Sequence, residues 1–479
     1  MCFKKFASLL LICILTLFTA FVFTGCGGDD TATVTSAETS IEMSSVNENI
    51  SSEVSSENSS KKEISSKKTS SKVMSSNQSQ IHYPNQSTIT SINKQTQNTT
   101  SNNDMDPLKY LTSKEKIYYG YDPDLYKLGL KNEGNSARIA ALMKKAQKGG
   151  NYKIAVLGGS ISAGAGASSI YSSYGNLICE WWCTNFPNAN FEFVCAGLGS
   201  TNPDMACYRI ETDLLKFKPD FVVVDFNVNT YLDDNLETTY STLLYKILSQ
   251  KNSPAVMSIE FTYCDKNNYS VSKYVSSREI ASAVKAYDIP TMSYHNYIWK
   301  KIKSRALSWI DIGYDYIHPN DNGHMVAANL INSYLNNVKD NLKKASTKIT
   351  TPKKPENTAF INLGYVTNTA KNVSFSGGFS AGSNTSPSNR GWSYVATAEP
   401  STLTVPVPTN RGVRIFMCFS GSSGGGITVK DSKNKSVNIF SSQAQTPTLV
   451  DIGKMEGKIT IETTEETVNF TIYGVGTYN

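Results

Sequence analysis

The feature that most constrains this fold is a short apolar run that ends in two glycines and a serine, within Lys153–Ser162. The run from Lys153 to Leu157 predicts a buried strand, and the glycines that follow it predict a sharp turn. A continuous apolar run of this kind is typical of a central strand in a parallel sheet. Ligands bind at the carboxyl ends of such strands, so the turn would present Ser160 at a crevice. Taken alone, the pattern fits an ordinary strand-to-helix turn at least as well.

A second polar cluster, further along the chain, supplies the groups that a serine nucleophile requires. Asp315 and His318 lie three residues apart, just before a helix-forming run. A serine hydroxyl needs a base to remove its proton, and that base needs a third group to orient it. Asn229 follows another buried run, Phe221–Asp225, and its amide could donate a hydrogen bond to a developing oxyanion.

These segments, in this order, resemble the SGNH (GDSL-like) hydrolase family, in the variant whose first block reads Gly-Gly-Ser-Ile-Ser/Thr. The resemblance covers roughly Ser136 to Leu335. It implies a serine esterase in which Ser160 is the nucleophile, His318 is the base and Asp315 orients that base. It implies no metal ion and no cofactor.

The same resemblance implies an oxyanion hole built from three donors. These are the backbone N–H groups of Ser160 and Gly199 and the side-chain amide of Asn229. Gly197 stays an alternative to Gly199, because the register of the second block is ambiguous.

The chain departs from the commonest family pattern at three positions. Gly159, Cys195 and Thr230 stand where many members have Asp, Asn and Asp. The first departure is shared by the Gly-Gly-Ser branch. The other two remove side chains that can buttress the oxyanion donors, so they bear on catalytic efficiency more than on the reaction class.

Other side chains compete for the catalytic roles. Asp225 and Glu260 lie at strand ends and are alternative acids, and Ser162 is an alternative nucleophile. His295 has no carboxylate three residues away. His324 lies at the start of the following helix and is expected to be structural.

Alternating strand and helix patterns predict an α/β fold with helices on both faces of a parallel sheet. The resemblance implies a three-layer, flavodoxin-like sheet of five parallel strands in the order 2-1-3-4-5. The expected strands are Ile154–Leu157, Phe191–Cys195, Phe221–Asp225, Ala255–Phe261 and Pro290–Tyr294.

Past about Thr351 the pattern changes to short β-branched or alternating runs separated by Gly, Ser, Asn and Pro. This predicts an antiparallel β-sandwich of jelly-roll type. Trp392 or Tyr394 could stack on a sugar ring, although aromatic residues in a small sandwich usually belong to the core. The expected strands are Ser401–Val407, Gly412–Cys418, Gly426–Val429, Ser436–Phe440, Lys458–Thr463 and Val468–Tyr473.

The N-terminus has the pattern of a targeting segment. Lys4 and Lys5 precede a long apolar run, and small residues precede Cys26. The end of the run resembles a bacterial lipoprotein processing site, which implies lipidation of Cys26. A plain secretory signal or an uncleaved anchor is the alternative.

The predicted organisation has four parts. Residues 1–25 form a lipoprotein-type signal peptide, and residues 26–104 form a tether rich in Ser, Asn and Lys. The tether holds too little apolar surface to fold, so we expect it to be disordered. Residues 105–345 form the catalytic domain, and residues 355–479 form the accessory sandwich.

Composition argues against two classes of site. The formal net charge of +6 becomes +4 when Lys4 and Lys5 leave with the signal peptide, and no basic stripe predicts a nucleic-acid partner. The cysteines after Cys26 lack the spacing of a zinc site and are expected to be buried free thiols, although their even number in an exported protein permits disulfides. Cys179 and Cys183, one helical turn apart, suggest a buried helix face. The six cysteines are Cys179, Cys183, Cys195, Cys207, Cys264 and Cys418.

Together these patterns predict an exported serine esterase, anchored to the cell membrane by lipid and facing the extracellular side. Its expected substrates are short acyl esters, with O-acetyl groups on carbohydrate favoured. An O-acyltransferase that uses the same three residues is an alternative function. A non-catalytic surface protein that binds carbohydrate is another.

Overall fold

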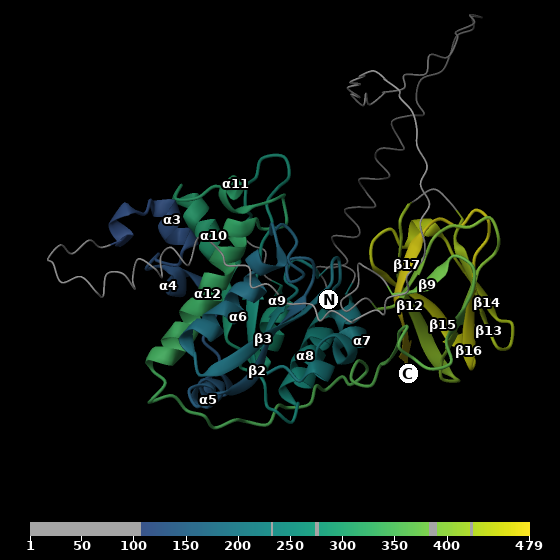
Figure 1. The fold of residues 1–479 in the computed structure, drawn as a ribbon, viewed down its shortest axis with the longest axis horizontal. Helices are drawn as coiled ribbons and strands as arrows, with labels where there is room; N and C mark the ends of the chain where they lie inside the picture. Colours follow the sequence, from purple (N-terminus) through teal and green to yellow (C-terminus); the bar gives the residue numbers. More distant parts are fainter. Residues whose placement is uncertain (1–106, 231–232, 274–276, 383–389, 422–424) are drawn as a thin grey trace, which may run out of the picture. The chain divides into compact units, whose positions relative to one another are not determined.

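The computed structural model describes residues 107–479 except 231–232, 274–276, 383–389 and 422–424. The described residues belong to one compact unit, which contains an α/β region followed by a β region (Figure 1). The predicted signal peptide, the tether and Cys26 lie outside the described residues. None of the helices in the described part of the chain has the length and apolar character needed to cross a membrane.

A six-stranded sheet lies at the centre of the α/β region. Its strands are ordered β1-β6-β5-β4-β2-β3, and all of them except β1 are parallel to one another. The parallel strands follow the order given by the family resemblance, whereas the antiparallel edge strand β1 was not predicted. The strands are β1 (Leu130–Asn132), β2 (Gly150–Gly158), β3 (Ala189–Gly197), β4 (Phe221–Asp225), β5 (Ala255–Glu260) and β6 (Thr291–Ser293).

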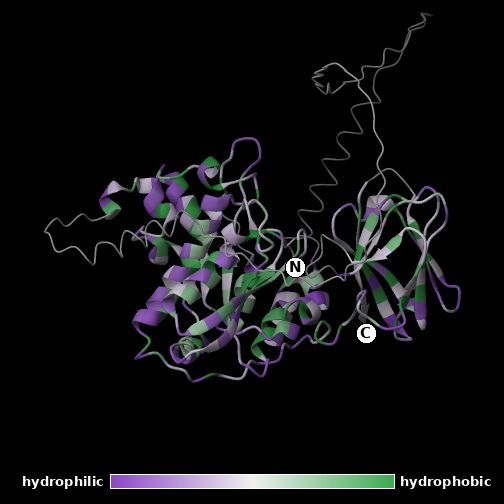
Figure 2. Ribbon diagram, viewed as in Figure 1, coloured by the Kyte–Doolittle hydropathy of each residue, from purple (hydrophilic) through white to green (hydrophobic). Residues whose placement is uncertain are grey.

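Helices cover both faces of this sheet, because successive side chains of a strand point to opposite faces and both sets are apolar here. In β2, Ile154 and Val156 belong to one core, while Ala155 and Leu157 belong to the other. Figure 2 shows the hydrophobic residues concentrated on the central strands. The first core includes α3 (Ser113–Tyr118), α4 (Leu125–Gly129), α5 (Ala137–Ala146), α6 (Tyr174–Asn185), α10 (Tyr294–Lys303), α11 (Trp309–Ile312) and α12 (Asp321–Asp340); the second includes α7 (Pro203–Asp213), α8 (Leu236–Leu248) and α9 (Arg278–Ala286).

Two of these helices start directly after loops that carry predicted site residues. Asn202 caps α7 by accepting a hydrogen bond from the backbone N–H of Met205 at 3.0 Å. Asn320 caps α12 in the same way, with the N–H of Gly323 at 3.1 Å. An asparagine cap satisfies a backbone donor that the first helical turn leaves unpaired, so both loops end at a defined residue.

The β region consists of two antiparallel sheets around one apolar core. One sheet has the order β15-β12-β17-β10-β9, with β7 also beside β17, and the other has the order β14-β13-β16-β11-β8. The six expected strands are present; β7 to β10 and β15 were not predicted. The strands are β7 (Gly364–Val366), β8 (Ser374–Phe375), β9 (Phe379–Ala381), β10 (Trp392–Tyr394), β11 (Thr402–Pro406), β12 (Arg411–Phe419), β13 (Ile427–Asp431), β14 (Ser436–Ile439), β15 (Thr448–Met455), β16 (Lys458–Glu462) and β17 (Phe470–Tyr478).

The side chains of Trp392 and Tyr394 lie inside this core, with exposed fractions of 0% and 2%. They are core residues, as favoured from the sequence, and neither offers a ring face to a sugar. Both side chains point to the same face of β10, because they are two residues apart on a strand, and that face packs in the core.

The six described cysteines are free thiols. Cys179, Cys207 and Cys264 are buried as predicted, but the prediction is wrong for Cys183, which lies with Thr184 on the exposed side of the last turn of α6. Cys195 and Cys418 are half-buried. Within the described ranges, no group of three or more His, Cys, Asp or Glu side chains is placed to hold a metal ion.

Candidate active site

The carboxyl ends of three adjacent strands bring predicted site residues to one edge of the sheet. Ser160 lies in the turn that follows β2, Gly199 lies in the loop after β3, and Asn229 lies in the loop after β4. Because β2 pairs in parallel with both β3 and β4, these three strand ends are neighbours. This is the edge at which doubly wound sheets bind ligands.

The loop between α11 and α12 brings Asp315 and His318 to the same place. The Nε2 atom of His318 lies 2.8 Å from the Oγ atom of Ser160, although the two residues are 158 positions apart. The Nδ1 atom of His318 lies 2.7 Å from a carboxylate oxygen of Asp315. Serine, histidine and aspartate thus form a continuous hydrogen-bonded chain, the geometry needed to move a proton off the hydroxyl.

Local hydrogen bonds fix the shape of this loop. The backbone N–H groups of Ile317 and His318 both donate to Oδ1 of Asp315 at 2.7 Å. The indole N–H of Trp309 donates to the Asp315 carbonyl at 2.6 Å, and the N–H of Tyr314 donates to the His318 carbonyl at 2.8 Å. Asp315 therefore holds the loop with one carboxylate oxygen and orients the imidazole with the other.

The same contacts set the charge of Asp315. Partial burial disfavours the carboxylate, but hydrogen bonds from the side chain and N–H of His318 and from the N–H of Ile317 outweigh it. They hold the pKa of Asp315 below its ordinary value. The group is therefore ionised at neutral pH, and a carboxylate in this position stabilises positive charge on the imidazole.

Gly159 and Asn229 are in close contact beside Ser160. A Cβ atom at position 159 would lie 2.2 Å from the Oδ1 atom of Asn229, so only glycine leaves room for this amide. The Oδ1 atom is buried and has no hydrogen-bond partner among the described residues. The absence of a side chain at position 159, where many SGNH proteins have Asp, thus determines where the Asn229 amide can lie.

The structure distinguishes the two glycines of the second block. Gly197 ends β3 in a tightly packed place, where an added Cβ would lie 2.2 Å from the backbone nitrogen of Ala163. Gly199 lies in the following loop, where an added Cβ would meet nothing closer than the Cβ of Ser160, at 3.9 Å. The next residue, Ser200, has a left-handed backbone with φ 57°. Of the two glycines, Gly199 is the one that borders Ser160.

The alternative nucleophile and acids make other contacts. Ser162 is buried, with its Oγ 2.7 Å from the hydroxyl of Tyr174 and 3.2 Å from the carboxylate of Asp225. Glu260 is buried, and its carboxylate lies 3.6 Å from the amine of Lys131. Neither carboxylate has a described hydrogen bond to His318.

The other two described histidines are held by neighbouring groups. His324 is buried in the first turn of α12, where its Nδ1 accepts from the N–H of Tyr174 at 3.3 Å. Burial lowers the pKa of His324 to about 4, so the ring is neutral at physiological pH. His295 lies 3.0 Å from the hydroxyl of Thr262 and 3.1 Å from the carbonyl of Lys273. No described hydrogen bond joins either ring to Ser160.

A buried arginine beneath the site was not predicted. Arg209, in α7, has an exposed fraction of 0%, and its guanidinium donates to the carbonyl oxygens of Gly158 at 2.9 Å and Ala196 at 2.7 Å. It also donates to the hydroxyl of Thr201 at 3.1 Å and pairs with Asp213 at 3.3 Å. The i,i+4 spacing of Arg209 and Asp213 was a signal in the sequence, but such pairs are usually found on exposed helix faces.

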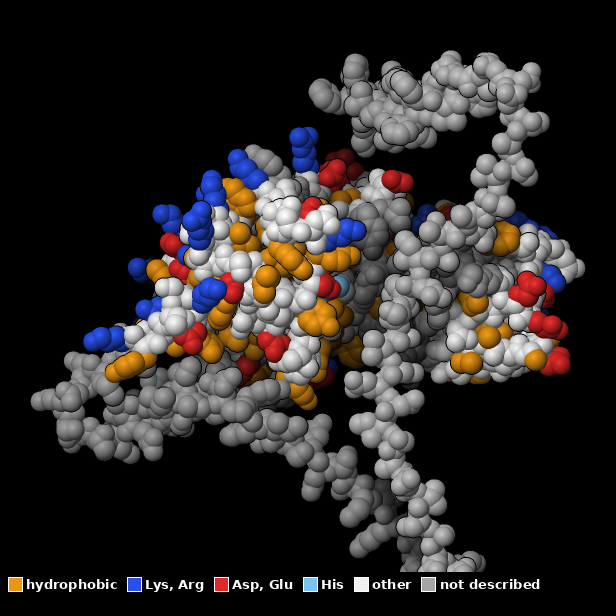
Figure 3. Space-filling view, turned by 90° about the horizontal axis from the view of Figure 1, so that it is seen from above, with side chains coloured by type: hydrophobic (Ala, Val, Ile, Leu, Met, Phe, Trp, Pro, Cys, Tyr) orange, Lys and Arg blue, Asp and Glu red, His pale blue; other side chains and the backbone are white. Residues whose placement is uncertain are grey.

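An open depression borders the site beside His318. It is lined by Gly166, Ala167, Ser168, Tyr314, Asn320, Asp321 and Asn322. The N–H and hydroxyl of Ser168 both donate to the Asp321 carboxylate at 2.7 Å, which ties the turn after Ser160 to the start of α12. Tyr314 has an exposed fraction of 73%. Figure 3 shows Lys and Arg side chains gathered along the upper left edge of the face that it draws, with hydrophobic and acidic side chains interspersed over the rest.

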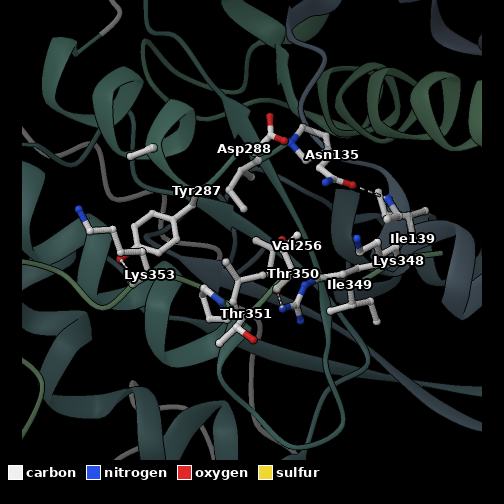
Figure 4. Close-up of a pocket in the computed structure, with 17 residues that line it drawn as sticks. Asn135, Ile139, Val256, Tyr287, Asp288, Lys348, Ile349, Thr350, Thr351 and Lys353 are labelled. Carbon is white, nitrogen blue, oxygen red and sulfur yellow. Dashed lines mark hydrogen bonds between the residues drawn. The ribbon is translucent and has the colours of Figure 1, made fainter. Parts of the chain in front are cut away.

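A cavity of ≈ 220 Å³ lies at the opposite edge of the sheet (Figure 4). Its lining includes Val256, near the amino end of β5, whereas Ser160 follows the carboxyl end of β2. Arg138 and Tyr287 donate hydrogen bonds across it to the carbonyl oxygens of Thr350, at 3.1 Å, and Lys353, at 2.9 Å. The segment between the α/β and β regions therefore forms one wall of the cavity, and none of the predicted catalytic residues lines it.

Comparisons with known proteins give a match among solved structures. No protein-family model matches this chain, and no curated protein matches it. A two-domain esterase active on acetylated mannans, also co-crystallised with mannopentaose, matches with a TM-score of 0.59 at 24% sequence identity. The match covers 74% of this chain and 98% of that chain. This chain has the fold of that esterase.

Two further solved structures match over a smaller share of this chain. An acetyl xylan esterase has a TM-score of 0.32 at 22% identity, covering 38% of this chain and 98% of that one. A variant of an acetyl-xylooligosaccharide esterase from Geobacillus has a TM-score of 0.32 at 16% identity, covering 38% of this chain and 94% of that one.

Proposed function

We propose that this protein is a serine esterase that removes acetyl groups from carbohydrate. The observation that carries the proposal is the 2.8 Å separation between Nε2 of His318 and Oγ of Ser160. Asp315, 2.7 Å from the other ring nitrogen, completes the arrangement. A serine in such a chain becomes nucleophilic as the imidazole takes its proton.

In the proposed reaction, Oγ of Ser160 attacks the ester carbonyl while His318 takes the hydroxyl proton. The carbonyl oxygen becomes an oxyanion, for which we assign the N–H groups of Ser160 and Gly199 and the amide of Asn229 as donors. His318 then gives its proton to the departing alcohol. A water molecule, deprotonated by His318, attacks the acyl-enzyme and releases acetate and free Ser160.

Three observations favour a small acyl group on a sugar. The turn after Ser160 runs through alanine and glycine only from Ala163 to Ala167, so this segment places no long side chain beside the hydroxyl. Tyr314, exposed next to the loop of His318, offers an aromatic face on which a sugar ring can stack. The two-domain esterase of the same fold acts on acetylated mannans.

The test compares the wild-type chain with Ser160→Ala and Ser162→Ala on p-nitrophenyl acetate, acetylated mannan and acetylated xylan. We expect Ser160→Ala to lower kcat by about 10⁴-fold or more, because loss of the nucleophile removes the covalent route. Ser162→Ala is the matched control, since its hydroxyl faces Tyr174 and Asp225, and should keep most of the activity.

Equal rates for wild type and Ser160→Ala would rule out the proposed esterase. Product analysis with an added sugar acceptor separates the alternatives. Acetyl transferred to the acceptor, in place of free acetate, would indicate an O-acyltransferase. Retention of the polymer on the protein without any release of acetate would indicate a carbohydrate-binding protein.

A further inference from the structure

We propose that the β region positions the nucleophile turn and the oxyanion loop through a relay of three buried charges, Arg390–Asp213–Arg209. The inference rests on the proposed function and assigns to the β region a part in the chemistry that does not involve contact with sugar. Arg390 is a positioning residue in this proposal, because it acts through Asp213 and Arg209 and not on the substrate.

The relay ends on the backbone that carries two of the proposed oxyanion donors. Arg209 donates to the carbonyl of Gly158, two residues before Ser160, and to the carbonyl of Ala196, three residues before Gly199. Its third partner, the hydroxyl of Thr201, donates in turn to the carbonyl of Leu198 at 2.7 Å. One guanidinium therefore ties together the end of β2, the end of β3 and the loop after β3.

The charge of Arg209 requires a partner at this depth, since an unpaired buried cation is strongly destabilising. Asp213, one helical turn later and 5% exposed, supplies it through Oδ2 at 3.3 Å. The Oδ1 atom of Asp213 accepts from the hydroxyl of Thr212 at 2.9 Å and from the guanidinium of Arg390. Arg390 is itself 4% exposed and lies two residues before β10.

Arg390 can affect the position of Arg209 because the two arginines pair with different carboxylate oxygens of Asp213. A carboxylate and a guanidinium prefer a bidentate pairing with two parallel hydrogen bonds. Because Arg390 occupies Oδ1, Asp213 offers Arg209 only Oδ2, and the other donors of Arg209 stay on the strand carbonyls. Without Arg390, only the Thr212 hydroxyl still holds Oδ1, and Asp213 can turn toward Arg209 and draw the guanidinium away from Gly158 and Ala196.

Other contacts dock the β region on α7 independently of Arg390. Leu198 and Met205 share an apolar cluster with Phe416 and Tyr473 of the β region. Arg414 of β12 lies 3.1 Å from Asp204 in the first turn of α7. Loss of Arg390 should therefore change the relay while the two regions stay docked, which makes the inference testable by substitution.

The experiment measures kcat and KM of the full chain for p-nitrophenyl acetate, a substrate with no sugar. We expect Arg390→Met to lower kcat by about tenfold to a hundredfold with little change in KM, because small displacements of oriented groups cost rates of this order. Arg390→Lys keeps a positive charge beside Asp213 and should restore most of kcat. A purely structural role would lower thermal stability without this split between kcat and KM.

Arg414→Met is the matched control, because it also removes an ion pair between the regions but lies outside the relay. It should reduce thermal stability, although by less than Arg390→Met because its ion pair is more exposed, and leave kcat unchanged. The inference is overturned if Arg390→Met leaves kcat unchanged, if Arg414→Met lowers kcat equally, or if Lys fails to restore it. An effect on KM for acetylated mannan alone would also overturn it and indicate sugar binding by the β region.

Hydrogen exchange provides a readout that needs no activity. In the Ser160→Ala background, Arg390→Met should speed amide exchange in residues 196–201, and Arg414→Met should not. If the wild-type chain hydrolyses no ester, the proposed function fails, and this exchange comparison still decides the inference: equal exchange in the two variants refutes it.

Discussion

At position 159, the absence of a side chain leaves the space in which the Asn229 amide lies. The Asn229 amide occupies the space that a Cβ at position 159 would need, directly beside Ser160. Asn229 makes no described hydrogen bond through Oδ1, so packing against the glycine is what limits its position. The geometry of the proposed oxyanion hole thus depends on two residues that do not bond to each other.

From this contact we predict that the addition of a single methyl group at position 159 strongly lowers the esterase activity. Gly159→Ala should lower kcat on p-nitrophenyl acetate by about 10²-fold or more, because the added methyl displaces an oxyanion donor. KM should change little, whereas the melting temperature should fall, because the added methyl forces buried neighbours to shift. Gly421→Ala, in the β region, where an added Cβ would meet nothing within 4 Å, provides the control for alanine at a glycine and should keep full activity. Equal activity of Gly159→Ala and wild type would remove Asn229 from the oxyanion hole.

Much of the candidate site could be predicted from the sequence because its residues lie at strand ends and in short motifs. Asp315 and His318 are three residues apart, so one loop carries both wherever it folds. The choice between Gly197 and Gly199 stayed open because it depends on where β3 ends, which the sequence does not specify. Arg209 was missed because spacing along a helix does not reveal which of its faces is buried.

At the scale of elements, the end of β4 carries a second polar cluster below the site. Asp225 is fully buried and accepts hydrogen bonds from the Ser162 hydroxyl, which in turn contacts the hydroxyl of Tyr174. One Asp225 oxygen has no hydrogen-bond partner among the described residues. Burial raises the pKa of Asp225 to about 7, against smaller effects of the Ser162 hydroxyl and the Asn227 N–H.

This buried carboxyl predicts a dependence of stability on pH. In the unfolded chain Asp225 has an ordinary pKa of about 4, so between about pH 4 and about pH 7 the folded protein holds a proton that unfolding releases. The free energy of unfolding therefore falls as the pH rises through this range. Asp225→Asn should remove this contribution, so its melting temperature should exceed that of wild type by more at about pH 8 than at about pH 5. A constant difference between the two proteins across this range would contradict it.

The strands of the α/β region were easier to predict than those of the β region, for a physical reason. Central parallel strands are buried on both faces and appear as continuous apolar runs, as Phe221–Asp225 does. β1 was missed because it is three residues long, lies at the sheet edge and contains an exposed lysine. In the β region, strands as short as Ser374–Phe375 are too brief to show the alternation that identifies a strand.

At the scale of the whole molecule, one helix serves two regions. α7 begins at the loop that contains Gly199, and its residues contact the β region through an apolar cluster and two ion pairs. The sequence predicted both regions but not this contact, because its apolar residues are distributed over separate segments with no periodic signal.

We propose that a lipid on Cys26 anchors the whole chain to the membrane, on the extracellular side.

The anchor can be tested in cells. Cys26→Ala should move the protein from the membrane fraction to the medium and abolish labelling by an alkyne fatty acid, since the thiol carries the lipid in this proposal. Cys13→Ala, a second cysteine of the N-terminal segment, is the control and should leave labelling unchanged. Labelling that persists in Cys26→Ala would show that the lipid is attached elsewhere or that the protein is held by an uncleaved segment.

The apolar cluster on α7 has a practical consequence for anyone seeking a minimal catalyst. A fragment cut after α12 would retain Ser160, Asp315 and His318, yet it would expose Leu198 and Met205 to water. It would also leave Asp213 without its second arginine. A chain trimmed at residue 345, the predicted end of the catalytic domain, would therefore lose the contacts that cover this apolar surface and that give Asp213 its second partner.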